Sequence, residues 1–154
     1  MKLEKWACCV VLGLCLWMAG GSAVLQAAPA PNRYAVAGIE NAAEFEKTFA
    51  DVQAAVAANA RSKVADHILY PLRVNGWTDE IKGKGTVKFD TRQEVLDNYD
   101  EIFTPQVKAA LAKQKVAELF VNWQGVMVGN GEIWLSVSEK APRRYGIIAV
   151  NLVQ

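Results

Sequence analysis

Few side chains in this 154-residue sequence combine reactivity with a spacing that suggests catalysis. His67 is the only histidine, and Tyr70 follows it three residues later on what reads as a short helix. An imidazole buried in a pocket can act as a general base near neutral pH. Asp66 is poorly placed to orient that ring, because adjacent helical residues point apart. We therefore favour the simpler interpretation, a histidine that caps a helix end or packs against it.

A group of carboxylates is the second candidate. Asp97, Asp100 and Glu101 share a helix face at i, i+3 and i+4. Such a group could bind a hard cation or carry out acid–base chemistry. Like charges at this spacing destabilise a helix by only about 0.2–0.5 kcal/mol, so a solvated face is the favoured explanation. If the chain is an enzyme, its candidate catalytic residues are His67, Tyr70, Tyr99 and Asp100.

We expect no metal site and no cofactor. With one histidine and no cysteine after Cys15, a zinc site would need carboxylates beyond His67, a donor set that zinc rarely uses. The segment Lys82-Gly83-Lys84-Gly85 lacks the spacing of a phosphate-binding P-loop and follows no apolar strand. We interpret it as a hairpin tip.

The most unusual feature of the sequence is a set of large apolar side chains that could form a binding surface. Aromatic residues and methionine, with glycines between them, can line a ligand pocket or a protein interface. Gln124 would supply a polar group at the mouth of such a pocket. The alternative is that these residues form core beneath the helices. The predicted binding residues are Trp77, Trp123, Gln124, Met127 and Trp134.

Residues 1–28 have the order of a secretory signal peptide. A short basic head precedes an apolar run from Trp6 to Met18, and small residues follow. The run is shorter than the roughly 20 residues that span a bilayer, although an uncleaved anchor is the alternative. We expect cleavage after Ala27 or Ala28 and a periplasmic or extracellular protein that does not contact the membrane afterwards.

Removal of this leader changes the chemistry of the chain. Cys8, Cys9 and Cys15 all lie within it, so the mature protein would have no disulfide and no thiolate. The leader contains two lysines and one glutamate, which leaves 15 basic and 15 acidic residues. A neutral chain without a basic stripe argues against nucleic acid as a partner. We interpret residues 29–40 as a linker or edge strand and residues 41–154 as one domain.

Helix start signals divide the first part of that domain. Asn41 and Thr91 are predicted N-caps, each followed three residues later by a glutamate as in a capping box. Ser62 is predicted to cap a short helix that ends before Pro71, and Thr104-Pro105 begins another helix. Apolar residues recur on single helical faces. They are Phe45, Phe49, Val52 and Val56 in the first helix, and Val95, Tyr99, Ile102 and Phe103 later.

Strand signals occupy the rest. Leu72–Phe89 reads as a loose hairpin that contains the turn signal Asn75-Gly76. The strongest hairpin signal is Asn130-Gly131, because both residues of a two-residue turn would take φ > 0. It pairs Val128 with Ile133, Met127 with Trp134 and Val126 with Leu135. A third strand is predicted over Tyr145–Val153.

This register makes both faces of the segment Phe120–Val137 apolar. A sheet that is exposed on one side normally has one polar face. Two apolar faces need two coverings, of which the helices supply only one. One predicted face carries Phe120, Val126, Val128, Ile133, Leu135 and Val137, with Asn122 and Gln124 at its far end. The other carries Val121, Trp123, Met127 and Trp134, with Gly125 and Gly129.

Helices followed by a long meander predict an α+β fold, with N-terminal helices packed on a curved antiparallel sheet. The order of elements resembles the NTF2-like (cystatin-like, cone-shaped) proteins. The resemblance rests on Tyr70-Pro71-Leu72, on the helix end Tyr99–Phe103 and on the hairpin over residues 122–134. It implies a sheet curved around a helix with a pocket at the open end. Members include ketosteroid isomerases and dehydratases as well as non-catalytic binding and dimerisation modules.

The leading functional expectation is a secreted or periplasmic, non-catalytic binding or interaction module. Its apolar pocket or sheet face would serve a small apolar ligand, a protein partner or a second copy in a homodimer. The first alternative is a small pocket enzyme of isomerase, dehydratase or hydrolase type that uses His67 or a carboxylate. The second is an envelope stress or toxin-neutralising protein.

Overall fold

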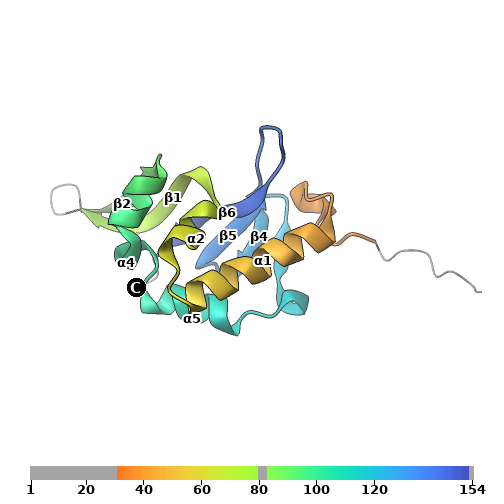
Figure 1. The fold of residues 1–154 in the computed structure, drawn as a ribbon, viewed down its shortest axis with the longest axis horizontal. Helices are drawn as coiled ribbons and strands as arrows, with labels where there is room; N and C mark the ends of the chain where they lie inside the picture. Colours follow the sequence, from red (N-terminus) through yellow and green to blue (C-terminus); the bar gives the residue numbers. More distant parts are fainter. Residues whose placement is uncertain (1–30, 80–82, 153–154) are drawn as a thin grey trace, which may run out of the picture. The chain divides into compact units, whose positions relative to one another are not determined.

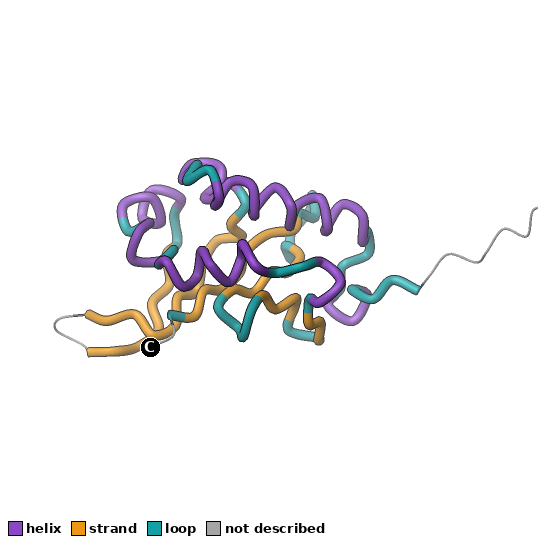
Figure 2. The backbone as a smooth tube through the Cα atoms, turned by 90° about the horizontal axis from the view of Figure 1, so that it is seen from below, coloured by secondary structure: helices purple, strands orange, loops and turns teal. Residues whose placement is uncertain are grey.

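The computed structural model describes residues 31–79 and 83–152. It confirms the α+β fold: α1 to α5 lie on one side of a six-stranded sheet (Figures 1 and 2). The helices are α1 (Ala42–Ala57), α2 (Arg61–Asp66), α3 (Arg92–Asp97), α4 (Tyr99–Ile102) and α5 (Pro105–Lys113), with 3₁₀ turns η1 (Ala35–Ala37) and η2 (Val116–Glu118). The strands are β1 (Ile68–Asp79), β2 (Gly83–Phe89), β3 (Phe120–Asn122), β4 (Gly125–Val128), β5 (Ile133–Val137) and β6 (Tyr145–Asn151). The predicted signal peptide, residues 1–28, lies outside the described residues.

Three of the four predicted helix starts are confirmed. The Asn41 side chain accepts a hydrogen bond from the Glu44 amide, Thr91 and Glu94 form a complete capping box, and Thr104 caps α5. The cap at Ser62 is wrong. The second helix begins at Arg61 after Ala60 without a side-chain cap. The turn after α1 already supplies a partner for the Arg61 amide, which donates to the Asn59 carbonyl oxygen at 3.0 Å. The apolar stripes predicted on α1 and on α3–α4 are buried.

The sheet is mixed rather than purely antiparallel as predicted. Its strand order is β2-β1-β6-β5-β4-β3, and β1 runs parallel to β6 while every other neighbouring pair is antiparallel. The antiparallel pairs β3–β4 and β4–β5 are joined by turns of two and four residues, which sequence signals can reveal. The parallel pair joins segments far apart in the sequence, so no turn signal marks it.

The segment 29–40 is expected to be a linker or edge strand, but its described part, residues 31–40, contributes Tyr34, Ala37 and Ile39 to the buried core. Tyr34 and Ile39 are fully buried on either side of η1. The Tyr34 ring lies against Phe45 with centroids 4.8 Å apart, and its hydroxyl donates to Glu46 at 2.9 Å. Burial, together with this hydrogen bond, raises the pKa of Tyr34 to about 12. The segment therefore packs directly onto α1.

The register predicted for the Asn130-Gly131 hairpin is confirmed, but its turn is different. Val126 pairs with Leu135, Met127 with Trp134 and Val128 with Ile133. The turn spans four residues, and Gly129 and Gly131, rather than Asn130, take positive φ. A wider turn with glycine at two positions keeps the same pairing. The two glycines supply the left-handed conformations that an asparagine would adopt less readily.

The predicted hairpin over Leu72–Phe89 is confirmed as β1–β2. Its Asn75-Gly76 signal marks a β-bulge instead of the turn, because the register shifts between Asn75 and Trp77 and Gly76 has a φ of 79°. The predicted tip at residues 82–85 falls partly on residues outside the described part of the chain.

A close backbone contact joins β6 to the end of α2. The Ile147 amide donates to the His67 carbonyl oxygen at 2.9 Å. A Cβ atom added at Gly146 would come well inside 3.0 Å of that same oxygen. Position 146 therefore has no room for a side chain.

We expect Gly146→Ala to lower the free energy of unfolding by about 1–3 kcal/mol, the usual cost of overpacking a filled site. Urea unfolding followed by circular dichroism measures it. Gly85→Ala is the matched control, since a Cβ there meets no atom within 4 Å and its effect should stay within about 0.5 kcal/mol. Equal effects of the two substitutions would contradict the importance of the contact.

Candidate functional site

The face of the sheet opposite the helices carries one row of paired residues that crosses all six strands. Each residue pairs with the next across neighbouring strands, so their side chains share a face. In sheet order the row is Lys88, Arg73, Ala149, Trp134, Met127 and Phe120. We call it the open-face row. Two cations stand at one end, three large apolar side chains stand at the other, and alanine lies between them.

Burial alternates along β1, β4 and β5 as this assignment requires, whereas Ala149 on β6 is itself fully buried. Val126 and Val128, on either side of Met127, are fully buried, while Met127 itself is partly exposed. Ile133 and Leu135 enclose partly exposed Trp134 in the same way. Phe120 is 52% exposed, which makes it one of the most exposed large apolar side chains among the described residues. Figure 2 shows α1 to α5 on the other side of the sheet.

The prediction of one continuous strand through Phe120–Gly129 is wrong, and with it the position of Trp123. A two-residue turn, Trp123-Gln124, separates β3 from β4 and pairs Asn122 with Gly125. The Asn122 side chain accepts from the Gln124 amide at 2.8 Å, and Gly125 has a φ of 140°. Asparagine followed by glycine three residues later was the signal that could have revealed this turn.

Because of this turn, several predicted binding residues lie elsewhere than the sequence predicts. It transfers Phe120 to the face of Met127 and Trp134, and it leaves Trp123 at the sheet edge, where 78% of the side chain is exposed. Gln124 is exposed beside it. Trp77 packs against the core instead, with its ring 5.1 Å from that of Phe89 in an edge-to-face arrangement. Of the five predicted binding residues, only Met127 and Trp134 share the open face.

The candidate catalytic residues are dispersed. His67 ends α2 and lines a surface depression of about 420 Å³ together with Asp51, Lys63 and Asp66. Tyr70 donates its hydroxyl proton to the Ala65 carbonyl oxygen at 3.0 Å. Asp51 and Asp66 are engaged in ion pairs with Lys47 and Arg92 at 2.7 Å each. The Lys47 hydrogen bond lowers the pKa of Asp51 below its usual value. The remaining walls of the depression are the alanines 54, 55, 58 and 60.

Tyr99 and Asp100 belong to a separate cluster. The Tyr99 ring stacks on Phe103, and the side chains of Arg61 and Lys108 lie over it at 5.1 and 5.3 Å. Both cations also pair with Asp100, at 2.8 and 3.7 Å. Burial raises the pKa of Tyr99, and its buried hydroxyl has no hydrogen-bond partner among the described residues. Neither residue lines the His67 depression.

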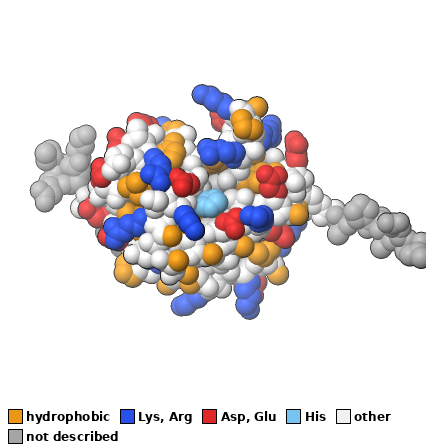
Figure 3. Space-filling model, in the orientation of Figure 1, with side chains coloured by type: hydrophobic (Ala, Val, Ile, Leu, Met, Phe, Trp, Pro, Cys, Tyr) orange, Lys and Arg blue, Asp and Glu red, His pale blue; other side chains and the backbone are white. Residues whose placement is uncertain are grey.

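Charges on the helix side of the molecule are interspersed (Figure 3). Acidic and basic side chains alternate there, and many are paired. In residues 31–79 and 83–152, no group of three histidine, cysteine or acidic residues could hold a metal ion. None of the described helices is long and apolar enough to cross a membrane.

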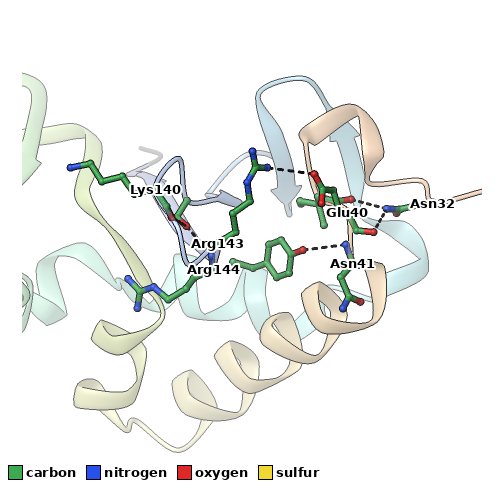
Figure 4. Close-up of polar contacts among 9 residues, drawn as sticks. Asn32, Glu40, Asn41, Lys140, Arg143 and Arg144 are labelled. Carbon is green, nitrogen blue, oxygen red and sulfur yellow. Dashed lines mark hydrogen bonds and ion pairs between the residues drawn. The ribbon is translucent and has the colours of Figure 1, made fainter.

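The loop between β5 and β6 carries three exposed basic residues, Lys140, Arg143 and Arg144, and its contacts lie near the start of α1 (Figure 4). Arg143 approaches Glu40 at 3.9 Å, and the Asn41 amide donates to the Tyr145 hydroxyl at 3.2 Å. These are exposed contacts, which contribute little to stability.

A second depression, of about 270 Å³, lies between the β4–β5 turn and α5. Its lining combines Ala109, Ala110 and Gly129 with six polar or charged residues, which are Gln106, Lys113, Gln114, Glu118, Asn130 and Glu132. Glu132 is only 5% exposed. Sequence patterns did not single out this residue, because a glutamate in a turn is ordinarily solvated.

Comparison of the chain with protein families, with curated proteins and with solved structures finds no match. The fold and the geometry of its surfaces are therefore the basis for a functional proposal.

Tyr99 and Tyr70 offer a direct test of the hydrogen-bond assignments. Tyr99→Phe removes a hydroxyl without a partner, so the free energy of unfolding should stay unchanged or rise. Tyr70→Phe removes a made hydrogen bond and should lower it by about 1 kcal/mol. Urea unfolding measures both. A loss of more than about 1 kcal/mol in Tyr99→Phe would show that its hydroxyl has a partner.

Proposed function

We propose that the chain is a secreted or periplasmic, non-catalytic interaction module with an NTF2-like fold, and that the open face of its sheet is the binding surface. The mixed sheet with helices on one side supports the fold assignment. The leader at residues 1–28 supports the location. The observation that carries the proposal is the open-face row, which leaves Phe120, Met127 and Trp134 at least partly exposed on one side of the sheet.

The inner face of the sheet gives less support to a ligand pocket. Large side chains from both layers fill the space between helices and sheet and are fully buried. They include Phe45, Phe49, Phe103, Leu111, Ile133 and Leu135. The unused apolar surface is therefore on the open face, where burial by a partner would remove it from water.

The occupant that the open-face row fits best is a second copy of the chain. Consider a two-fold axis that runs parallel to the strands between Ala149 and Trp134. The second copy then meets the row in reverse order, so Phe120 faces its Lys88, Met127 faces its Arg73 and Trp134 faces its Ala149. The largest side chain opposes the smallest, which keeps the spacing of the two layers even.

Charge also favours this arrangement. The two cations of each copy lie opposite an aromatic ring and a thioether instead of each other, and a cation over an aromatic face is attracted to it. An axis through the cationic end would oppose like charges. The mature chain, with 15 basic and 15 acidic residues, has no net charge to oppose association.

We expect the protein, recovered after export with its own leader, to sediment as a dimer in analytical ultracentrifugation. Trp134→Glu should weaken dimerisation by at least about 100-fold, because position 134 faces Ala149 of the second copy and not a cation. An unpaired buried carboxylate costs several kcal/mol, and each 1.4 kcal/mol is a factor of ten. Ala50→Glu places the same charge at an exposed position of α1 and should leave the dimer intact. A wild-type monomer at all concentrations would overturn the self-association proposal.

Cross-linking tests the register of the two copies. In a chain whose Cys8, Cys9 and Cys15 are changed to serine, Arg73→Cys and Met127→Cys are made separately and mixed. A bismaleimide of about 10 Å, the distance between packed sheets, should join the two variants to each other. Met127→Cys alone should cross-link poorly, since three strand spacings of about 4.8 Å separate its two copies sideways. The reverse pattern would rule out this axis.

A further inference from the structure

Glu132 is the one buried charged side chain in the described part of the chain. It belongs to the four-residue turn between β4 and β5, which adjoins the 270 Å³ depression. Burying a carboxylate is costly unless it is paired or hydrogen-bonded. Such a residue therefore requires an explanation that a surface glutamate does not.

The turn holds the Glu132 carboxylate in one place. Its Oε2 atom accepts from the Asn130 amide at 2.6 Å. A Cβ atom added at Gly129 would come well inside 3.0 Å of Oε2, so glycine at 129 leaves the room that the carboxylate occupies. The Gly129 amide donates to Gln114 Oε1 at 2.7 Å, and the Glu132 carbonyl accepts from the Asn151 amide at 2.8 Å.

The hydrogen bonds within the turn leave most of this carboxylate's capacity unused. An ionised carboxylate offers about four acceptor positions. Among residues 31–79 and 83–152, the Asn130 amide is the single donor found for it, and no lysine, arginine or histidine pairs with it. Lys113, in the last turn of α5, lines the same depression without forming an ion pair with Glu132. Glu118 also lines it, and its carboxylate is paired with Lys115 at 3.2 Å.

We propose that this depression binds a small molecule that carries a protonated primary amine, with the ammonium group donating to Glu132. An ammonium is the complement of a fixed buried carboxylate, because the hydrogen bonds are charge-assisted on both sides. Lys113 on the wall of the same depression would attract an anionic group of that molecule. The preferred class is therefore a small zwitterion such as an α-amino acid, or the amino terminus of a peptide. This site is independent of the open-face row.

The test uses three probes of similar size: L-alanine, propylammonium and propionate. Each is titrated into the wild-type protein while the amide resonances of Gly129 and Gly131 are followed by nuclear magnetic resonance. We expect L-alanine and propylammonium to shift these resonances with saturation, and propionate to leave them in place. An alanyl dipeptide that binds more tightly than L-alanine would identify a peptide amino terminus as the natural ligand, and the opposite order would identify a free amino acid.

Two variants separate the roles of the charges. Glu132→Gln keeps an acceptor for the Asn130 amide and should weaken both amine probes at least about tenfold. Lys113→Gln should weaken L-alanine but not propylammonium. Absence of any saturable shift in the wild-type protein with either amine would overturn the proposal, and would show that the carboxylate serves the turn alone. Equal shifts with propionate would also overturn it.

Discussion

The pairing of β1 with β6 is the contact on which the rest of the structure depends. It joins the helices and the β1–β2 hairpin to the C-terminal meander, and it is the only parallel pair among the strands described. It begins where the Ile147 amide meets the His67 carbonyl oxygen, over a glycine that leaves no room for a side chain. His67 thus takes part through its backbone, in a role unrelated to the chemistry of its imidazole.

This central pair determines what each face of the sheet can do. All five helices cover one face, and the aromatic and aliphatic side chains between the layers fill it. Exposed apolar side chains consequently remain on the opposite face, where charged and apolar residues occupy opposite ends of one row. The candidate catalytic side chains are likewise engaged in contacts within the domain. Tyr70 and Asp100 are each held by a partner within the domain, and the Tyr99 ring stacks on Phe103 with Arg61 and Lys108 nearby.

A chain of polar contacts connects the open face to the backbone of the β4–β5 turn that contains Glu132. Thr86 donates to Asn75, the Asn75 amide group donates to Asn151 at 2.6 Å, and Asn151 donates through its side chain to the Gly131 carbonyl oxygen. The Asn151 backbone amide holds the Glu132 carbonyl as well. The position of the β4–β5 turn, and with it of Glu132, is therefore set by β6 and β1 and not by the hairpin alone.

Local chemistry in the sequence determined the helix starts at Asn41, Thr91 and Thr104, the buried stripes of the helices, and the register of Val126–Val128 against Ile133–Leu135. These features depend on residues a few positions apart, so their signals lie within one stretch of chain. Tertiary structure alone decided the parallel pair, the incorporation of residues 31–40 into the core and the burial of Glu132. The Trp123-Gln124 turn shows how the two levels meet. Its signal was local, but the same apolar run also contains the turn signal at Asn130-Gly131. The face on which Phe120 lies depends on the turn at Trp123-Gln124, which pairs Phe120 with Met127. Side chains on a strand alternate between faces, so a single unrecognised turn reverses the assignment of a residue, and only the packed sheet shows which face remains open.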